Sequence, residues 1–175
     1  VLKHPNVLMV SDEIYEPLTY GGFKHVSVAG FSPEHKAQTL VLNGVSKAYS
    51  MTGWRIGYAA GNEQIVGAMT KLQEQSTSNP ASISHKAAAF ALTMDQSVVG
   101  EMCAAFDKRR EYIVNRTNKI PGVRCLNPDG AFYIFPNLSH YFGHRFNGKL
   151  IADMDALAAY FLDSAHVALV AGGSF

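Results

Sequence analysis

A lysine and an arginine eight residues apart, Lys47 and Arg55, are the first pair in this sequence that could do chemistry. Lys47 stands just past the apolar run 39–42, in a turn whose small residues would let a bulky ligand approach the backbone. In a largely desolvated site the pKa of a lysine falls, so its amine can form a Schiff base and later move a proton. A guanidinium group matches a phosphate through two parallel hydrogen bonds. The pair therefore favours lysine chemistry on a phosphate-bearing ligand.

A second apolar run, 7–10, leads into Asp12 and, three residues later, Tyr15. In open α/β sheets, ligands bind at the carboxyl ends of the strands, where Asp12 would stand. Tyr15 would face the same pocket if the turn between them is helical. A carboxylate, a lysine and a phosphate-binding arginine form the set that pyridoxal phosphate enzymes use, because an ionised aspartate keeps the pyridine nitrogen protonated.

Each of these residues also has an ordinary explanation. Lys47 alone would be a surface lysine, and Asp12 alone would be a helix cap or a turn residue. Tyr15 alone would be a core or rim aromatic, and Ser46 a turn former. Arg55 alone would form a surface ion pair. Residue type and spacing therefore leave the assignment open.

The elements that must position these residues alternate between short strands and helices. Apolar runs and turn residues predict strands at 7–10, 39–42, 55–60, 123–126, 131–135 and 167–170. Helical spacing of apolar residues predicts helices at 63–78, 82–94, 96–120 and 153–165. The fold class predicted is α/β, with a mostly parallel sheet and helices, followed by part of a smaller α+β unit. We place the boundary beside the long helix, giving domains 1–108 and 109–175.

Composition excludes several other classes of protein. The 175 residues are 47% apolar, and fifteen Lys+Arg against fourteen Asp+Glu leave a net charge of +1. Disorder and charge-driven binding to nucleic acid or membranes are therefore not expected. Cys103 and Cys125 are too few for a disulfide framework and indicate reduced thiols in a cytoplasm. His140 and His144 have the spacing of helical metal ligands, but Gly143 weakens a helix there and no third ligand is near, so no metal is expected.

Several segments, in order along the chain, resemble class I aminotransferases, which are fold-type-I pyridoxal phosphate enzymes. Residues 43–58, NGVSKAYSMTGWRIGY, look like their lysine motif, and 11–15, SDEIY, match their aspartate–tyrosine motif. Residues 129–136, DGAFYIFP, resemble a strand motif of their small domain. Residues 75–80 and 82–84 are similar to the segment that follows the lysine motif in bacterial-type aspartate aminotransferases.

The resemblance implies a role for each of five residues. Lys47 would form the Schiff base with pyridoxal 5'-phosphate and carry the 1,3-proton transfer. Asp12 would pair with the pyridine nitrogen, and Tyr15 would donate to the phenolic oxygen of the ring, which lowers the pKa of the Schiff base. Ser46 and Arg55 would hold the phosphate.

The function implied is ping-pong transamination between an L-amino acid, aspartate or glutamate, and a 2-oxo acid, by a cytoplasmic homodimer. Relatives of the same fold that act as carbon–sulfur or cyclopropane-forming lyases share the Asp, Tyr, Lys and Arg set, so a lyase stays open, as does a non-catalytic fragment. The chain begins at Val1 without Met and is about half the family's length, so we expect truncation at both ends. The substrate-carboxylate arginine would lie beyond Phe175.

Overall fold

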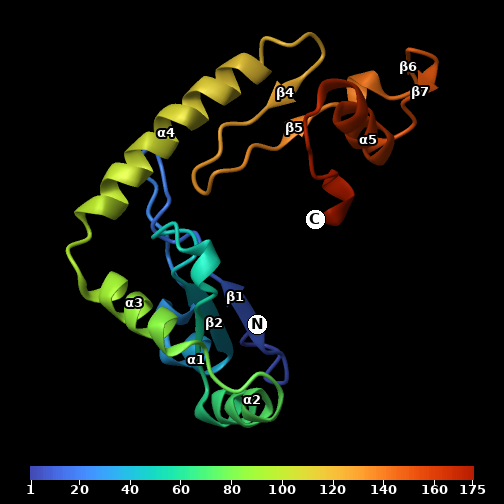
Figure 1. Ribbon diagram of the computed structural model, residues 1–175. Helices are drawn as coiled ribbons and strands as arrows, with labels where there is room; N and C mark the ends of the chain where they lie inside the picture. Colours follow the sequence, from blue (N-terminus) through green and yellow to red (C-terminus); the bar gives the residue numbers. More distant parts are fainter. The chain divides into compact units, whose positions relative to one another are not determined.

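The computed structural model describes all residues from 1 to 175, and two compact units divide them. The first unit contains residues 1–104 and 129–131, and the second contains 105–128 and 132–175. The main helices are α1 Pro33–Ala37, α2 Glu63–Ser76, α3 Ser82–Thr93, α4 Ser97–Thr117 and α5 Met154–Ala165 (Figure 1). The strands are β1 Met9–Asp12, β2 Thr39–Gly44, β3 Gly57–Ala60, β4 Arg124–Cys125, β5 Pro136–Asn137, β6 Arg145–Phe146 and β7 Lys149–Leu150.

The first unit is built on a sheet of order β1-β2-β3. Strand β1 runs parallel to β2, with Asp12 opposite Leu42, and β3 runs antiparallel to β2, with Gly57 opposite Gly44. The α/β class is confirmed, although the sheet within these residues is mixed. Strand β2 is well covered, since Thr39 and Leu40 are buried. The apolar run at 7–10 is typical of a strand buried on both faces, but β1 is not one: Val10 is 58% exposed, because β1 pairs with β2 alone and no element of the described chain covers that side chain.

The four longer predicted helices are confirmed, with ends set by local capping. Asn62 begins α2 by accepting hydrogen bonds from the backbone N–H groups of Gln64 and Ile65. Asp153 begins α5 in the same way, accepting from the N–H of Ala156 at 2.9 Å. Such side chains satisfy N–H groups that have no partner inside the helix.

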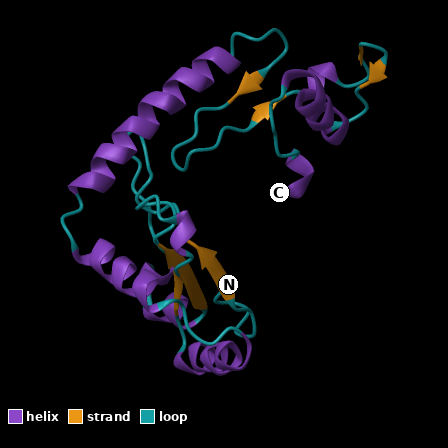
Figure 2. Ribbon diagram, in the orientation of Figure 1, coloured by secondary structure: helices purple, strands orange, loops and turns teal.

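The second unit has only two-residue strands (Figure 2). The predicted strand at 131–135 is wrong, because Ala131 has a left-handed backbone (φ 60°) and the residues after it have no strand partner. Their rings pack singly instead: Phe132 stacks on Phe106, with ring centres 5.5 Å apart. The predicted strand at 167–170 is also wrong, since His166 ends α5 in a left-handed conformation (φ 56°) and no strand lies beside the residues that follow. No helix is both long and apolar enough to cross a membrane.

Candidate active site

Asp12 and Lys47 lie at the carboxyl ends of two neighbouring parallel strands. Asp12 is the last residue of β1, and it lies opposite Leu42 of β2. Strand β2 ends at Gly44, and the turn that begins there carries Lys47. Adjacent strands lie about 4.8 Å apart, so both residues are brought to the same edge of the sheet. This is the edge at which open α/β sheets bind ligands.

Tyr15 lies beside Lys47. The Lys47 ammonium nitrogen Nζ is 5.9 Å from the centre of the Tyr15 ring. Both side chains are half-buried, whereas Asp12 is exposed. The Asp12 carboxylate accepts a hydrogen bond of 3.2 Å from the backbone N–H of Ile14, which fixes one of its oxygens on the turn that leads to Tyr15.

The loop that holds Lys47 and Arg55 is closed at its base by the β2–β3 pair. Val45 N–H lies 3.5 Å from Ile56 O, and Gly44 pairs with Gly57. Val45 is fully buried and Ile56 is 7% exposed, and both pack with Ala88 of α3 in one apolar cluster. The two ends of the loop are therefore anchored in the core.

Arg55 and Ser46 lie at opposite ends of this loop. Arg55 ends a short 3₁₀ turn, Thr52–Trp54, in a left-handed conformation (φ 56°), and its guanidinium donates to Thr52 O at 2.9 Å. Its side chain is exposed, so the remaining donors of the guanidinium face outward. Ser46 directly precedes Lys47 and is half-buried.

A second loop contact links the lysine turn to the helices. Tyr49 packs against the Val45 cluster, and its hydroxyl donates to Gln96 Oε1 at 2.7 Å. Gln96 in turn donates to the carbonyl oxygens of Ala91 and Met94. Burial, and secondarily the negative charge of Glu16, raise the pKa of Tyr49 above its ordinary value, so the phenol stays protonated as a donor. This hydrogen bond of Tyr49 was not predicted from the sequence.

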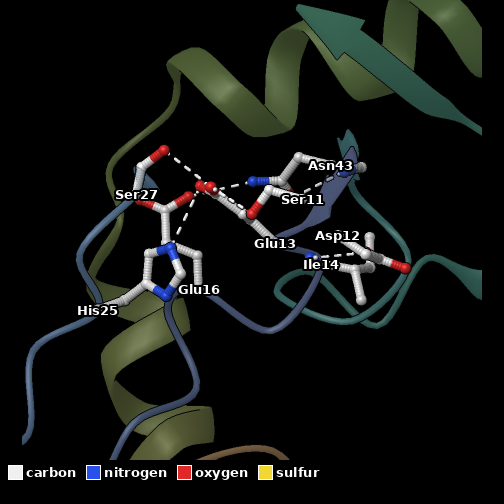
Figure 3. Close-up of polar contacts among 9 residues, drawn as sticks. Ser11, Asp12, Glu13, Ile14, Glu16, His25, Ser27 and Asn43 are labelled. Atoms are coloured by element: carbon white, nitrogen blue, oxygen red, sulfur yellow. Dashed lines mark hydrogen bonds and ion pairs between the residues drawn. The ribbon is translucent and has the colours of Figure 1, made fainter. Parts of the chain in front are cut away.

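Glu13, which follows Asp12 directly, was not predicted to belong to the site. Its side chain is almost fully buried among Ser11, His25 and Ser27 (Figure 3). Side chains alternate between the two faces of a strand, so the neighbour of an exposed Asp12 points inward. The continuous apolar run at 7–10 shows no such alternation, so no sequence pattern predicted the burial of Glu13. The rings of His140 and His144, for which no metal was expected, have centres 5.7 Å apart, and no group of three potential metal ligands is present.

Comparison with known proteins identifies the family and the fold of the chain. The family model for aminotransferase class I and II matches residues 1–175. An aspartate aminotransferase of Geobacillus stearothermophilus is 52% identical over 172 residues, which are 97% of this chain and 42% of the relative. The crystal structure of the aspartate aminotransferase of Rhizobium meliloti superposes with a TM-score of 0.92 at 44% identity, covering 99% of this chain and 44% of that one.

An aromatic aminotransferase of Pyrococcus horikoshii superposes with a TM-score of 0.87 at 32% identity, again over 99% of this chain and 44% of that one. The chain therefore spans a little under half the length of the relatives that it matches. The match runs through the whole chain, and the fold of these neighbours is that of the fold-type-I pyridoxal phosphate enzymes, as the fold-class prediction expected. This chain belongs to the aminotransferase class I and II family.

Proposed function

We propose that this chain is part of a pyridoxal phosphate-dependent aminotransferase in which Lys47 holds the cofactor. The observation that carries the proposal is the amine of Lys47 beside the Tyr15 ring, at the sheet edge where Asp12 ends the neighbouring strand. In domain terms, residues 1–108 would belong to the large cofactor-binding domain and 109–175 to the smaller C-terminal one.

The chemistry of the side chains present fits this cofactor. Pyridoxal phosphate needs an amine for its aldehyde, an acceptor for its ring N–H, a donor for its phenolic oxygen and a cation for its phosphate. Lys47, Asp12, Tyr15 and Arg55 are of these four types, in that order. When bound, the cofactor supplies an electron sink for the electrons left as the substrate α-proton departs.

Each residue would have a distinct task. Asp12 would hold the proton on the ring nitrogen, since an ionised carboxylate favours a cationic partner. Tyr15 would donate a hydrogen bond to the phenolic oxygen and thereby stabilise negative charge on it. Lys47 would move the proton between substrate and cofactor carbons. Ser46 and Arg55 would hold the phosphate, Arg55 with donors beyond the one that it spends on Thr52.

The substrates proposed are an L-amino acid of the aspartate or glutamate type and a 2-oxo acid, exchanged by a ping-pong mechanism. Support for the acidic amino acid comes from the relatives named as aspartate aminotransferases. A more distant neighbour is named as an aromatic aminotransferase, so the rates with aspartate and with aromatic amino acids should be compared directly. The family resemblance also supports a homodimer in the cytoplasm.

Borohydride reduction tests the cofactor assignment. The intact protein that contains these residues is loaded with pyridoxal phosphate, reduced, digested and mapped by mass spectrometry. We expect a pyridoxyl group on Lys47, and none there in a Lys47→Ala variant. A wild-type adduct on another lysine, or no adduct, would overturn the proposal.

Product analysis tests the reaction. With aspartate and 2-oxoglutarate, an aminotransferase conserves the amino group and forms a second amino acid. Free ammonia or sulfide from suitable donors, without a new amino acid, would instead indicate the lyase that shares this residue set.

A further inference from the structure

Glu13 is a buried carboxylate in the middle of the Asp12–Tyr15 segment. It is 5% exposed, and it accepts hydrogen bonds from Ser27 Oγ at 2.7 Å and from Ser11 Oγ at 3.0 Å. His25 Nε2 lies 3.1 Å from its other oxygen (Figure 3). Three donors from two separate stretches of chain therefore meet on one carboxylate.

The ionised form of Glu13 is the form that this pocket favours. Burial by itself raises the pKa of Glu13, but the hydrogen bonds from Ser27, His25 and Ser11, and then the charge of His25, outweigh it and lower the pKa below 4.5. Hydrogen bonds to an ionised group are about twice as strong as those between neutral groups. At neutral pH the ionised Glu13 carboxylate therefore holds Ser11, His25 and Ser27 by strong hydrogen bonds.

These hydrogen bonds act on the backbone that carries Asp12 and Tyr15. Glu13 N–H donates to Leu42 O of β2 at 2.8 Å, so its backbone is tied to the neighbouring strand while its side chain is tied to residues 25 and 27. Farther along the same turn, the Glu16 carboxylate accepts from Asn43 Nδ2 at 3.0 Å. The turn is held on both sides of Tyr15.

We propose that Glu13 is a positioning residue of the cofactor site: by gathering Ser11, His25 and Ser27 it fixes the turn from which Asp12 and Tyr15 reach the cofactor. The proposal rests on the proposed function. It goes beyond it by assigning a role to a residue that does not itself meet the cofactor. Side chains locked by a surrounding layer of hydrogen bonds hold binding groups in their productive geometry.

A merely structural cluster would change stability and nothing else, so the test needs readouts at the cofactor. Two are suitable in the intact protein: the Kd of pyridoxal phosphate, and the midpoint pH of the absorbance change of the bound cofactor. The variants are Glu13→Gln and the milder Ser27→Ala, which keeps the carboxylate. Glu34→Gln is the matched control, because Glu34 is an exposed carboxylate that accepts one serine hydrogen bond, from Ser32.

We expect Glu13→Gln to weaken cofactor binding by about tenfold, the lower end of the loss seen when a hydrogen-bonding partner of a metal ligand is removed. Glu34→Gln should stay within about twofold of wild type, as surface changes do. The midpoint pH should rise in Glu13→Gln and in Ser27→Ala, because a displaced Tyr15 no longer stabilises negative charge on the phenolic oxygen, and an unstabilised charge holds a nearby proton more tightly. Loss of the Glu13 charge alone would shift that midpoint downward, so the sign of the shift separates the two causes.

A background without the Tyr15 hydroxyl completes the test. In Tyr15→Phe protein, Glu13→Gln should produce no upward shift of the midpoint, since the group through which it acts is gone. An unchanged or lowered midpoint in the single variants, or an equal upward shift in the Tyr15→Phe background, would overturn the positioning role. If Glu13→Gln does not fold, Ser27→Ala decides the question by the same readouts. Lack of a cofactor adduct on wild-type Lys47 is a different failure, which would overturn the proposed function and this inference with it.

Discussion

The close approach of β2 and β3 at Gly44 makes one substitution especially informative. A Cβ added at Gly44 would lie 2.8 Å from Ile56 O, 3.1 Å from Gly57 Cα and 3.2 Å from Ile14 Cδ1. The first two atoms are backbone atoms of the first residue of β3 and of the residue just before it, so neither can rotate away as a side chain could. Gly44→Ala must therefore push β3 away from β2, at the base of the loop that carries Lys47 and Arg55.

Overpacking of this kind costs about 1–3 kcal/mol. The loss of backbone freedom in the unfolded chain offsets about 0.4–1 kcal/mol of that cost. A net destabilisation of about 1–2 kcal/mol remains, which for a domain of this size lowers Tm by about 3–6 °C. The same displacement moves the start of the lysine loop, so the fraction of Lys47 that can be trapped by borohydride should also fall.

Gly53→Ala is the matched control, because it lies in the same loop and a Cβ there meets nothing within 4 Å. Both variants and the wild type would be compared by thermal unfolding followed by circular dichroism, and by cofactor trapping. We expect Gly53→Ala to leave Tm unchanged to within about 2 °C, as surface substitutions do. Equal Tm values for Gly44→Ala and wild type, or equal losses in the two variants, would refute the argument from strand spacing.

Three further outcomes follow from the structure. Gly67 lies in exposed helix α2, where an added Cβ meets nothing within 4 Å. Because glycine loses more backbone freedom on folding than alanine, Gly67→Ala should raise the free energy of unfolding by about 0.5–1 kcal/mol in urea titrations, and a lower free energy of unfolding would contradict this prediction. Tyr49→Phe, which removes the hydrogen bond to Gln96 and keeps the ring, should lower it by about 0.5–1.5 kcal/mol, and an unchanged value would show that the bond contributes nothing. The folded-state pKa of Glu13 lies below 4.5, so the contribution of the ionised carboxylate to the free energy of unfolding is complete above that pH and is lost as the pH falls through the folded-state pKa. The difference in free energy of unfolding between wild type and Glu13→Gln should therefore become smaller below about pH 4.5. A difference that grows as the pH falls would contradict this prediction.

The local pattern of apolar residues predicted an element correctly where its formation depends mainly on its own residues. The runs before Asp12 and Lys47 lead into β1 and β2, and the four longer helices lie where helical spacing predicted them. The strand predicted at 131–135 failed because β-propensity needs a partner strand, and the left-handed Ala131 turns the chain away from any ladder. A run of apolar and aromatic residues looks the same whether its rings line a strand or pack one by one, as Phe132 does on Phe106.

Residue types and their order along the chain are sufficient for the family resemblance and for the chemical groups of the site: an amine, a carboxylate, a phenol and a guanidinium. The position of Lys47 Nζ beside the Tyr15 ring, and the hydrogen bonds that Glu13 accepts from residues 11, 25 and 27, are seen only in the folded chain. The physical reason is that strand pairing and burial act between segments far apart in sequence. A buried carboxylate is stable only where such segments supply its hydrogen bonds, and spacing along the chain does not specify where they meet.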